Sequence, residues 1–157
     1  MSVHNLKSLF NPNRVAVVGA GREPSQLGHI VLRNLIDGGF DGVVYPINPG
    51  RESVSGVQAY PSIAETPAKP ELAIVCTPAA AVPEVVRACG EEKVPAIAVL
   101  SAGFREAGAE GAELEQAVRV SEGLAKRHGA APTVSGSSSQ CAKKPMARFR
   151  RNYPLNL

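Results

Sequence analysis

Four short apolar runs, rich in β-branched residues, recur along this chain and are the strongest constraint on its fold. They cover residues 14–19, 43–47, 71–76 and 95–100, and turn-forming residues follow each of them. Runs of this kind are typical of strands that are buried on both faces of a parallel sheet. Helical segments between parallel strands give right-handed crossovers, with helices on both faces of the sheet. We therefore expect an α/β fold, a single domain with a Rossmann-like, doubly wound parallel sheet.

The segments between the runs agree with this expectation. Apolar residues recur at helical spacing from Leu27 onward. We expect this helix to end at Gly38-Gly39, because glycine adopts a left-handed conformation without strain. The other expected elements are helices at 79–92 and 108–127, an extended stretch at 57–60 and a brief helix near 62–66.

The composition is that of a globular protein with one domain. Its 157 residues are 44% hydrophobic and 20% charged, which suits one packed core. No apolar run approaches the ~20 residues that a membrane helix needs, and the first residues lack the basic start and apolar stretch of a secretory signal. Three scattered cysteines fit a reducing compartment better than a disulfide framework or a metal site. We therefore expect a cytoplasmic protein with no membrane partner.

Charge is distributed unevenly along the chain. Residues 1–118 carry a net charge of −4, and residues 119–157 carry a net charge of +7. From residue 130 the sequence is basic and Ser-rich with no apolar period, which predicts a disordered tail and leaves open a short strand around Thr133–Val134. A nucleic-acid-binding arm is the alternative use of such a tail and would bind with a steeply salt-dependent affinity. We do not expect a nucleic-acid partner.

The first candidate site is the glycine-rich loop that follows the first strand, from Gly19 to Gly28. Backbone N–H groups in such a loop, with the positive end of the following helix, form a site for phosphate. The dinucleotide pattern GxGxxG is not met, since Gly19 and Gly21 fit but Pro24 stands at the third position. The loop is therefore wider than a nicotinamide-binding turn, and a plain tight turn is the alternative interpretation.

The second candidate site is the turn after the second strand, Asn48-Pro49-Gly50-Arg51. Nicotinamide-binding folds usually place an acid there to hold the ribose 2′-hydroxyl. Arginine suits a phosphorylated ribose instead, through charge-assisted and often bidentate hydrogen bonds. The turn argues against NAD and leaves NADP or a nucleotide with a 3′-phosphate, such as coenzyme A. The alternative interpretation of Arg51 is a solvated turn residue.

The third and fourth candidates are Thr77-Pro78 and Ser101-Ala102-Gly103, which follow the third and fourth strands. Ligands in this architecture bind beyond the carboxyl ends of the strands, so hydroxyl and amide groups here would lie near any ligand. Taken alone, each is an ordinary capping residue. The sequence shows no Ser/His/Asp set, carboxylate pair or metal cluster, and its three histidines fit structural roles. We expect no catalytic residue and no metal site.

A set of short motifs runs in order along residues 9–104. The motifs are Leu9-Phe10-Asn11-Pro12, Val15–Ala20, Gly28-His29, Leu32–Leu35, Val44–Pro49, Tyr60-Pro61-Ser62, Leu72–Val75, Val82-Pro83 and Ser101–Phe104. In content and spacing they resemble the CoA-binding domain of NDP-forming acyl-CoA synthetases. This family includes ADP-forming acetate–CoA ligases and relatives of the succinyl-CoA ligase alpha subunit.

The resemblance implies a Rossmann-like domain that binds coenzyme A. In the family, the loop after the first strand contacts the CoA phosphates, and the Asn-Pro turn and the end of the fourth strand also line the site. Together with the strand-end positions above, this gives the expected coenzyme-binding residues as Gly19, Gly21, Arg22, Ser25, Gln26, Asn48, Pro49, Arg51, Thr77, Pro78, Ser101, Ala102 and Gly103. The family commonly has serine where Gly21 stands, which removes one expected hydroxyl contact.

The resemblance ends near Arg127-His128-Gly129. Complete enzymes of the family continue into domains that hold a phosphorylated histidine and an ATP-grasp fold. We therefore expect residues 1–129 to form the CoA-binding domain, and we hypothesise that residues 130–157 are a frameshifted or truncated continuation. Such a chain would bind CoA or acyl-CoA without turnover, alongside a ligase or ATP-grasp subunit or domain. Whether it counts as an enzyme, and whether it forms homo-oligomers, stays open.

Two other functions are compatible with the residues. One is a stand-alone regulatory Rossmann protein that binds CoA or NAD(P). The other is an NADP-dependent oxidoreductase, which needs a substrate domain that 157 residues cannot supply. A titration with CoA and with nicotinamide nucleotides would separate these classes.

Overall fold

The computed structural model describes residues 8–101 and 133–135. The helix expected at 108–127, the residues Ala102 and Gly103 and most of the tail lie outside these described residues.

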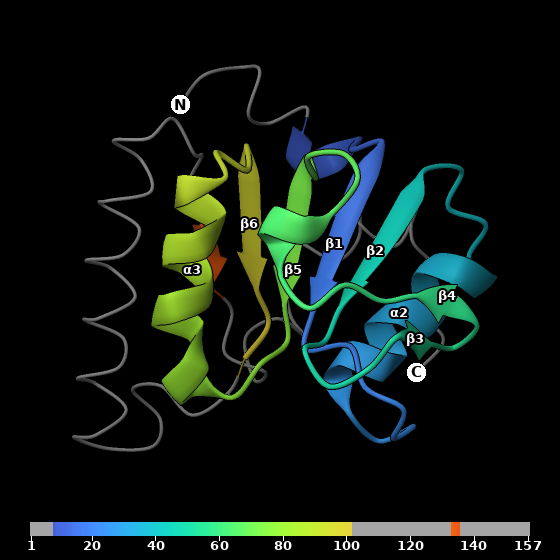
Figure 1. Ribbon diagram of the computed structural model, residues 1–157. Coiled ribbons are helices and arrows are strands. Elements are labelled where there is room, and N and C mark those ends of the chain that lie inside the picture. Colours follow the sequence, from blue (N-terminus) through green and yellow to red (C-terminus); the bar gives the residue numbers. More distant parts are fainter. Residues whose placement is uncertain (1–7, 102–132, 136–157) are drawn as a thin grey trace.

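A five-stranded parallel sheet forms the centre of the fold, with the strand order β2-β1-β5-β6-β7 (Figure 1). Its strands are β1 (Arg14–Val18), β2 (Val43–Ile47), β5 (Leu72–Val75), β6 (Ala96–Val99) and β7 (Thr133–Ser135). The expected parallel sheet is thus confirmed, and the four strongest apolar runs supply four of its strands. The short strand that the sequence left open near residue 133 is the fifth, and it pairs in parallel with β6.

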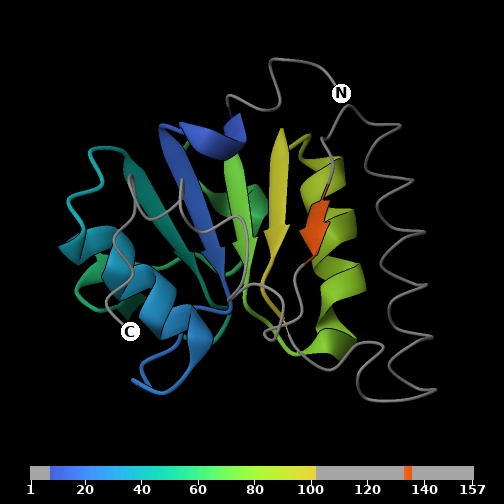
Figure 2. The same cartoon turned by 180° about the vertical axis from the view of Figure 1, so that it is seen from behind.

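Two helices cover opposite faces of this sheet, as Figures 1 and 2 show from the two sides. Helix α2 (Leu27–Asp37) lies on one face and helix α3 (Val82–Glu91) on the other. The remaining elements are two 3-10 turns, η1 (Ile63–Glu65) and η2 (Ala79–Ala81), and a small hairpin of β3 (Ser53–Val54) and β4 (Val57–Gln58). The helices on both faces confirm the doubly wound arrangement.

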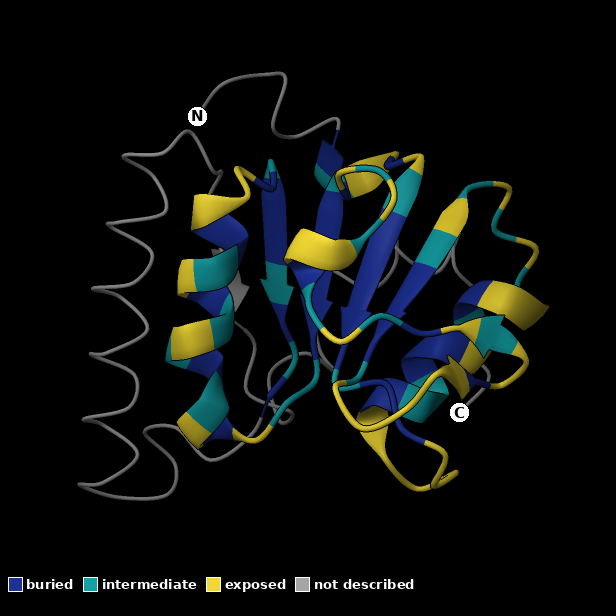
Figure 3. Cartoon of the chain, viewed as in Figure 1, coloured by how far each residue is buried: buried dark blue, intermediate teal, exposed yellow. Residues whose placement is uncertain are grey.

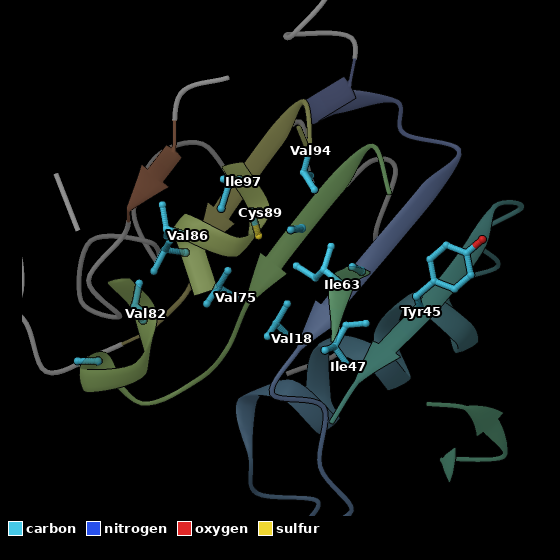
Figure 4. Close-up of a cluster of buried hydrophobic side chains, with 14 residues drawn as sticks. Val18, Tyr45, Ile47, Ile63, Val75, Val82, Val86, Cys89, Val94 and Ile97 are labelled. Carbon is cyan, nitrogen blue, oxygen red and sulfur yellow. The ribbon is translucent and has the colours of Figure 1, made fainter. Parts of the chain in front are cut away.

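Alternation along the strands divides the buried side chains between two clusters. The α3-side core, shown in Figure 4, contains Ala16, Val18, Tyr45, Ile47, Ile63, Ala73, Val75, Ala79, Val82, Val86, Cys89, Val94, Ile97 and Val99. The α2-side core contains Val15, Val17, Ala20, Val31, Leu32, Leu35, Val54, Ala59, Leu72, Ile74 and Ala96. Successive residues of a strand point to opposite faces, so both faces of β1 and β5 are apolar and buried (Figure 3).

The ends of the helices follow from glycine and proline. Gly38 donates its N–H to Asn34 O at 2.9 Å, and Gly39 has φ +71°, which confirms the left-handed glycine expected at the end of α2. The helix expected at 79–92 begins instead with the 3-10 turn η2. Pro83 explains the difference, because its nitrogen has no hydrogen to donate to Ala79 O, as a continuous α-helix would require. Val82 donates to that oxygen in its place.

Strand β2 is an edge strand, and part of its outer side is covered by the chain itself. Tyr60 donates its N–H to Pro46 O at 2.9 Å and accepts the N–H of Asn48 at 2.9 Å. The Tyr60 ring also packs edge-on against Tyr45, with 5.6 Å between the ring centres. The stretch expected to be extended near residue 60 therefore lies beside β2. Within the described part of the chain, no helix is long and apolar enough to cross a membrane.

Candidate functional site

The carboxyl ends of four parallel strands meet at one edge of the sheet, the lower edge in Figure 1. The loops that follow β1, β2, β5 and β6 therefore lie together, as expected for this architecture. All of the described residues that the sequence singled out belong to these four loops. The position of each group determines what the edge can bind.

The loop after β1 is held tightly against its neighbours. Gly19 has φ +85°, and a side chain there would come within 3.1 Å of Cys76 and Thr77. Its N–H donates to Ile47 O at 3.1 Å. A side chain at Gly28 would come within 2.2 Å of Gly19 O. Glycine at both positions lets the start of α2 lie directly against the end of β1, so the positive end of the helix lies close to the loop.

The side chains of Arg22, Ser25 and Gln26 are exposed on this loop. Gln26 is the N-cap residue of α2, yet its side chain makes no capping hydrogen bond, and the first turn of α2 has no acidic residue. Its amide oxygen lies over Gly21, 2.1 Å from the place that a Cβ would take. In the described residues the N–H groups of Gly21 and Arg22 have no hydrogen-bond partner. Free N–H groups beside the positive end of a helix form a cradle for an anion.

Asn48 connects this loop to the turn after β2. Its Nδ2 donates to Ala20 O at 2.7 Å, and its Oδ1 accepts the N–H of Gly50 at 2.9 Å. The side chain expected to bind a coenzyme is thus used within the protein, to hold two loops together. His29, to which the sequence assigned a structural role, approaches the same loop from α2, with Nδ1 3.0 Å from Gly21 O.

A groove of about 630 Å³ lies beside the turn that follows β2. It is lined by Pro49, Gly50, Arg51, Glu52, Gln58, Ala59 and Pro61. The Arg51 guanidinium is exposed and has no ion-pair partner in the described part of the chain. Gln58 and Pro61 were not predicted as site residues. The β3–β4 hairpin brings Gln58 to the groove, and the Tyr60-Pro61-Ser62 motif does not by itself place Pro61 there.

The ends of β5 and β6 meet through Thr77 and Ser101. The Ser101 hydroxyl, which is buried, donates to Thr77 O. The Thr77 hydroxyl is itself buried and has no hydrogen-bond partner within residues 8–101 and 133–135. A buried hydroxyl without a partner is costly unless a ligand or water satisfies it. The two strand ends at which the sequence predicts ligand-binding hydroxyls are thus in contact.

The cysteine next to this edge of the sheet, Cys76, is a weak nucleophile. Burial raises the pKa of the Cys76 thiol to about 12, so at neutral pH the residue next to Thr77 is a thiol and a poor nucleophile. The described residues contain no group of His, Cys, Asp and Glu side chains that could hold a metal ion. A smaller hollow of about 340 Å³ lies at the opposite edge of the sheet, where Arg14 and Glu71 form an ion pair of 3.1 Å.

Comparison with known proteins gives one consistent result. The family described as "CoA binding domain" matches residues 13–126. Acetate–CoA ligase [ADP-forming] II of Archaeoglobus fulgidus is 39% identical over 128 residues, which are 82% of this chain and 19% of the relative. Acetate–CoA ligase [ADP-forming] I subunit alpha of Pyrococcus furiosus is 38% identical over 116 residues, 71% of this chain and 25% of the relative.

A solved structure agrees with these relatives. It is the dinucleotide forming Acetyl-coenzyme A synthetase 1 of Ca. Korarchaeum cryptofilum in complex with phosphate and ADP, with a TM-score of 0.75 and 36% identity. The match covers 86% of this chain and 28% of that chain. The chain thus spans about a quarter or less of the length of these relatives.

Proposed function

The chain belongs to the family of CoA-binding domains, and from this premise we propose that it is the coenzyme-holding part of an ADP-forming acyl-CoA synthetase. The family and the relatives support coenzyme A as the ligand. The short span of the match supports a module that needs further domains for the complete reaction. The four-loop edge of the sheet is the place where the coenzyme would bind.

The loop between β1 and α2 would hold the pyrophosphate of the coenzyme. The N–H groups of Gly21 and Arg22, which have no partner within the described residues, and the positive end of α2 supply the attraction for the charge. The exposed side chains of Arg22, Ser25 and Gln26 would add contacts from the outer side. The partnerless Thr77 hydroxyl and the neighbouring Ser101 would face the pantetheine arm as it crosses the ends of β5 and β6.

One observation carries the assignment of the ligand: a free arginine lines a groove at the place where NAD-binding folds have an acid. Arg51 follows the Asn48–Gly50 turn, and the groove beside it is large enough for a nucleoside. A guanidinium there can bind the 3′-phosphate of coenzyme A. The ribose of NAD, with free 2′- and 3′-hydroxyl groups, would lack the acidic side chain that usually binds it. Pro49 and Pro61 would offer apolar surface to the base.

The test is calorimetric titration of the full chain and of the Arg51→Ala variant, each with CoA and with dephospho-CoA. Loss of one charge-assisted contact at an exposed site should weaken CoA about tenfold and leave dephospho-CoA nearly unchanged. Arg33→Ala is the matched control, because Arg33 is exposed and, among the described residues, its ion-pair partner is Asp37 on α2. Equal weakening of both ligands would remove Arg51 from the 3′-phosphate, and tighter binding of NADPH than of CoA would overturn the proposed function.

In the complete reaction, an acid would be joined to CoA through an acyl phosphate and a phosphohistidine, while a nucleoside triphosphate is converted to the diphosphate and phosphate. This chain would supply only the thiol substrate, held at the strand ends. The described part contains one histidine, His29, whose Nδ1 is engaged with Gly21 O. A ligase or ATP-grasp subunit or domain is therefore the proposed partner. The chain alone, given ATP, acetate and CoA, should form no thioester. Measurable turnover would contradict the proposal that the catalytic groups belong to a partner subunit or domain.

A further inference from the structure

His29 is in contact with the phosphate-binding loop, although it was not among the predicted coenzyme-binding residues. Its Nδ1 lies 3.0 Å from Gly21 O, and Asn48 Nδ2 lies 2.7 Å from the preceding carbonyl oxygen, that of Ala20. We propose that His29 is a positioning residue for coenzyme binding: it holds the Gly21 carbonyl so that the N–H of the same peptide group faces the ligand. The inference rests on the proposed function.

The geometry of the peptide group gives this contact its effect. A trans peptide is planar, and its C=O and N–H point in opposite directions; the described part of the chain has no cis peptide bond. The Gly21 carbonyl shares its peptide with the N–H of Arg22, and the Ala20 carbonyl shares its peptide with the N–H of Gly21. Neither of these two N–H groups has a hydrogen-bond partner in the described residues. The contacts of His29 and Asn48 therefore engage the carbonyl side of both peptides and leave their N–H groups unbonded within the described residues.

The loop needs such a device because glycine gives it freedom. Gly19 and Gly21 lie on either side of Ala20, and glycine loses more conformational entropy on ordering than any other residue. A loop that is fixed before the ligand arrives avoids that loss during binding, so the affinity is higher. Fixing both carbonyls from inside the protein orders the cradle without occupying any group that the phosphate would use.

The contact also fixes the protonation pattern of the ring. A carbonyl oxygen can only accept, so the hydrogen must be on His29 Nδ1, and the neutral ring has Nε2 without a hydrogen. This tautomer can be measured in the absence of any ligand. The ¹⁵N chemical shifts of the ring in the full chain at pH 8 should show the Nδ1–H form. The Nε2–H form would overturn the proposal, whatever the chain binds.

The binding test compares three variants of the full chain by calorimetric titration with CoA. His29→Ala should weaken CoA about five-fold, the equivalent of one net hydrogen bond. His29→Asn should return the affinity to within about two-fold of the unchanged chain, because the asparagine amide nitrogen takes the place of Nδ1. Arg33→Ala, on the exposed side of the same helix, should bind CoA normally.

The outcomes separate the two proposals. Normal CoA affinity in His29→Ala, even with a lowered melting temperature, would show that the histidine stabilises the fold only, and would overturn the positioning role while the proposed function stands. Failure of His29→Asn to recover the affinity would overturn it as well. Absence of CoA binding by the unchanged, folded chain would overturn the proposed function and with it the role of His29 in binding.

Discussion

Replacing Gly28 with alanine should destabilise the protein, because the new methyl group would collide with main chain. The added Cβ would lie 2.2 Å from Gly19 O, 2.8 Å from Gly19 C and 3.1 Å from Ala20 Cα. All three atoms belong to the backbone at the end of β1, so no side chain can rotate away. Helix α2 would have to move off the strand, and the phosphate-binding loop would move with it.

The size of the effect follows from two opposing terms. Overpacking typically costs about 1–3 kcal/mol, and a backbone obstacle places Gly28 near the upper value. Alanine in place of glycine in a helix returns at most about 1 kcal/mol. The net loss should be about 2 kcal/mol, which lowers the melting temperature by about 4–8 °C in a chain of this length.

Thermal unfolding followed by circular dichroism measures this change. Gly50→Ala is the control, because a Cβ at Gly50 meets nothing closer than 3.5 Å, the Asn48 Oδ1 atom. A melting temperature for Gly28→Ala equal to or above that of the unchanged protein would refute the argument that close backbone approach requires this glycine.

Other perturbations test the rest of the fold. Lys93 has φ +53° at the end of α3, so Lys93→Gly should raise the free energy of unfolding by up to about 1 kcal/mol in urea denaturation. Leu32 is fully buried in the α2-side core, and Leu32→Ala should lower the same free energy by about 2–5 kcal/mol. Burial raises the pKa of Cys76 and of Cys89 from 9.0 to about 12. In a Cys141→Ser background, the fully buried Cys89 thiol should therefore react with a thiol reagent at pH 8 only after unfolding, and the half-buried Cys76 thiol should react more slowly in the folded than in the unfolded chain. As the pH rises from 9 to 12, the thiols lose their protons in the unfolded chain before they lose them in the folded chain, so the free energy of unfolding should fall over this range and be unaffected below pH 9. Urea midpoints at pH 8 and pH 10.5 would detect the change.

The elements that depend on local chemistry were predictable. The run at 43–47 coincides with β2, and the glycines after residue 37 end α2 as expected, because β-branched apolar runs and terminal glycines act through their own backbone conformations. The onset of α3 was less predictable. The helical pattern predicts a helix that begins at Ala79, with Pro83 in its first turn. Because Pro83 has no N–H, residues Ala79–Ala81 form a 3-10 turn and the α-helix begins at Val82.

The site was predictable where a residue follows a strand and unpredictable where it depends on distant chain. Thr77 and Ser101 could each be placed at the carboxyl end of a strand, but their contact depends on the adjacency of β5 and β6, which the structure shows. Gln58 could not be placed beside Arg51, because the groove depends on the β3–β4 hairpin. The turn of this hairpin has Ser55 at φ +52°, and serine does not by itself predict that conformation. The role of His29 depends on the loop folding back over eight residues, and no motif records that.

The edge strand β2 also limits how the sheet can pair with a second molecule. Main-chain groups on the open side of an edge strand are a template for another strand, and natural proteins block such edges. On β2 the carbonyl of Pro46 and the N–H of Asn48 are already bonded to Tyr60, and the nitrogen of Pro46 has no hydrogen to offer. A strand from a second copy would therefore find no ladder to extend over this stretch. Pro46 and Tyr60 thus also block strand pairing along this part of the β2 edge.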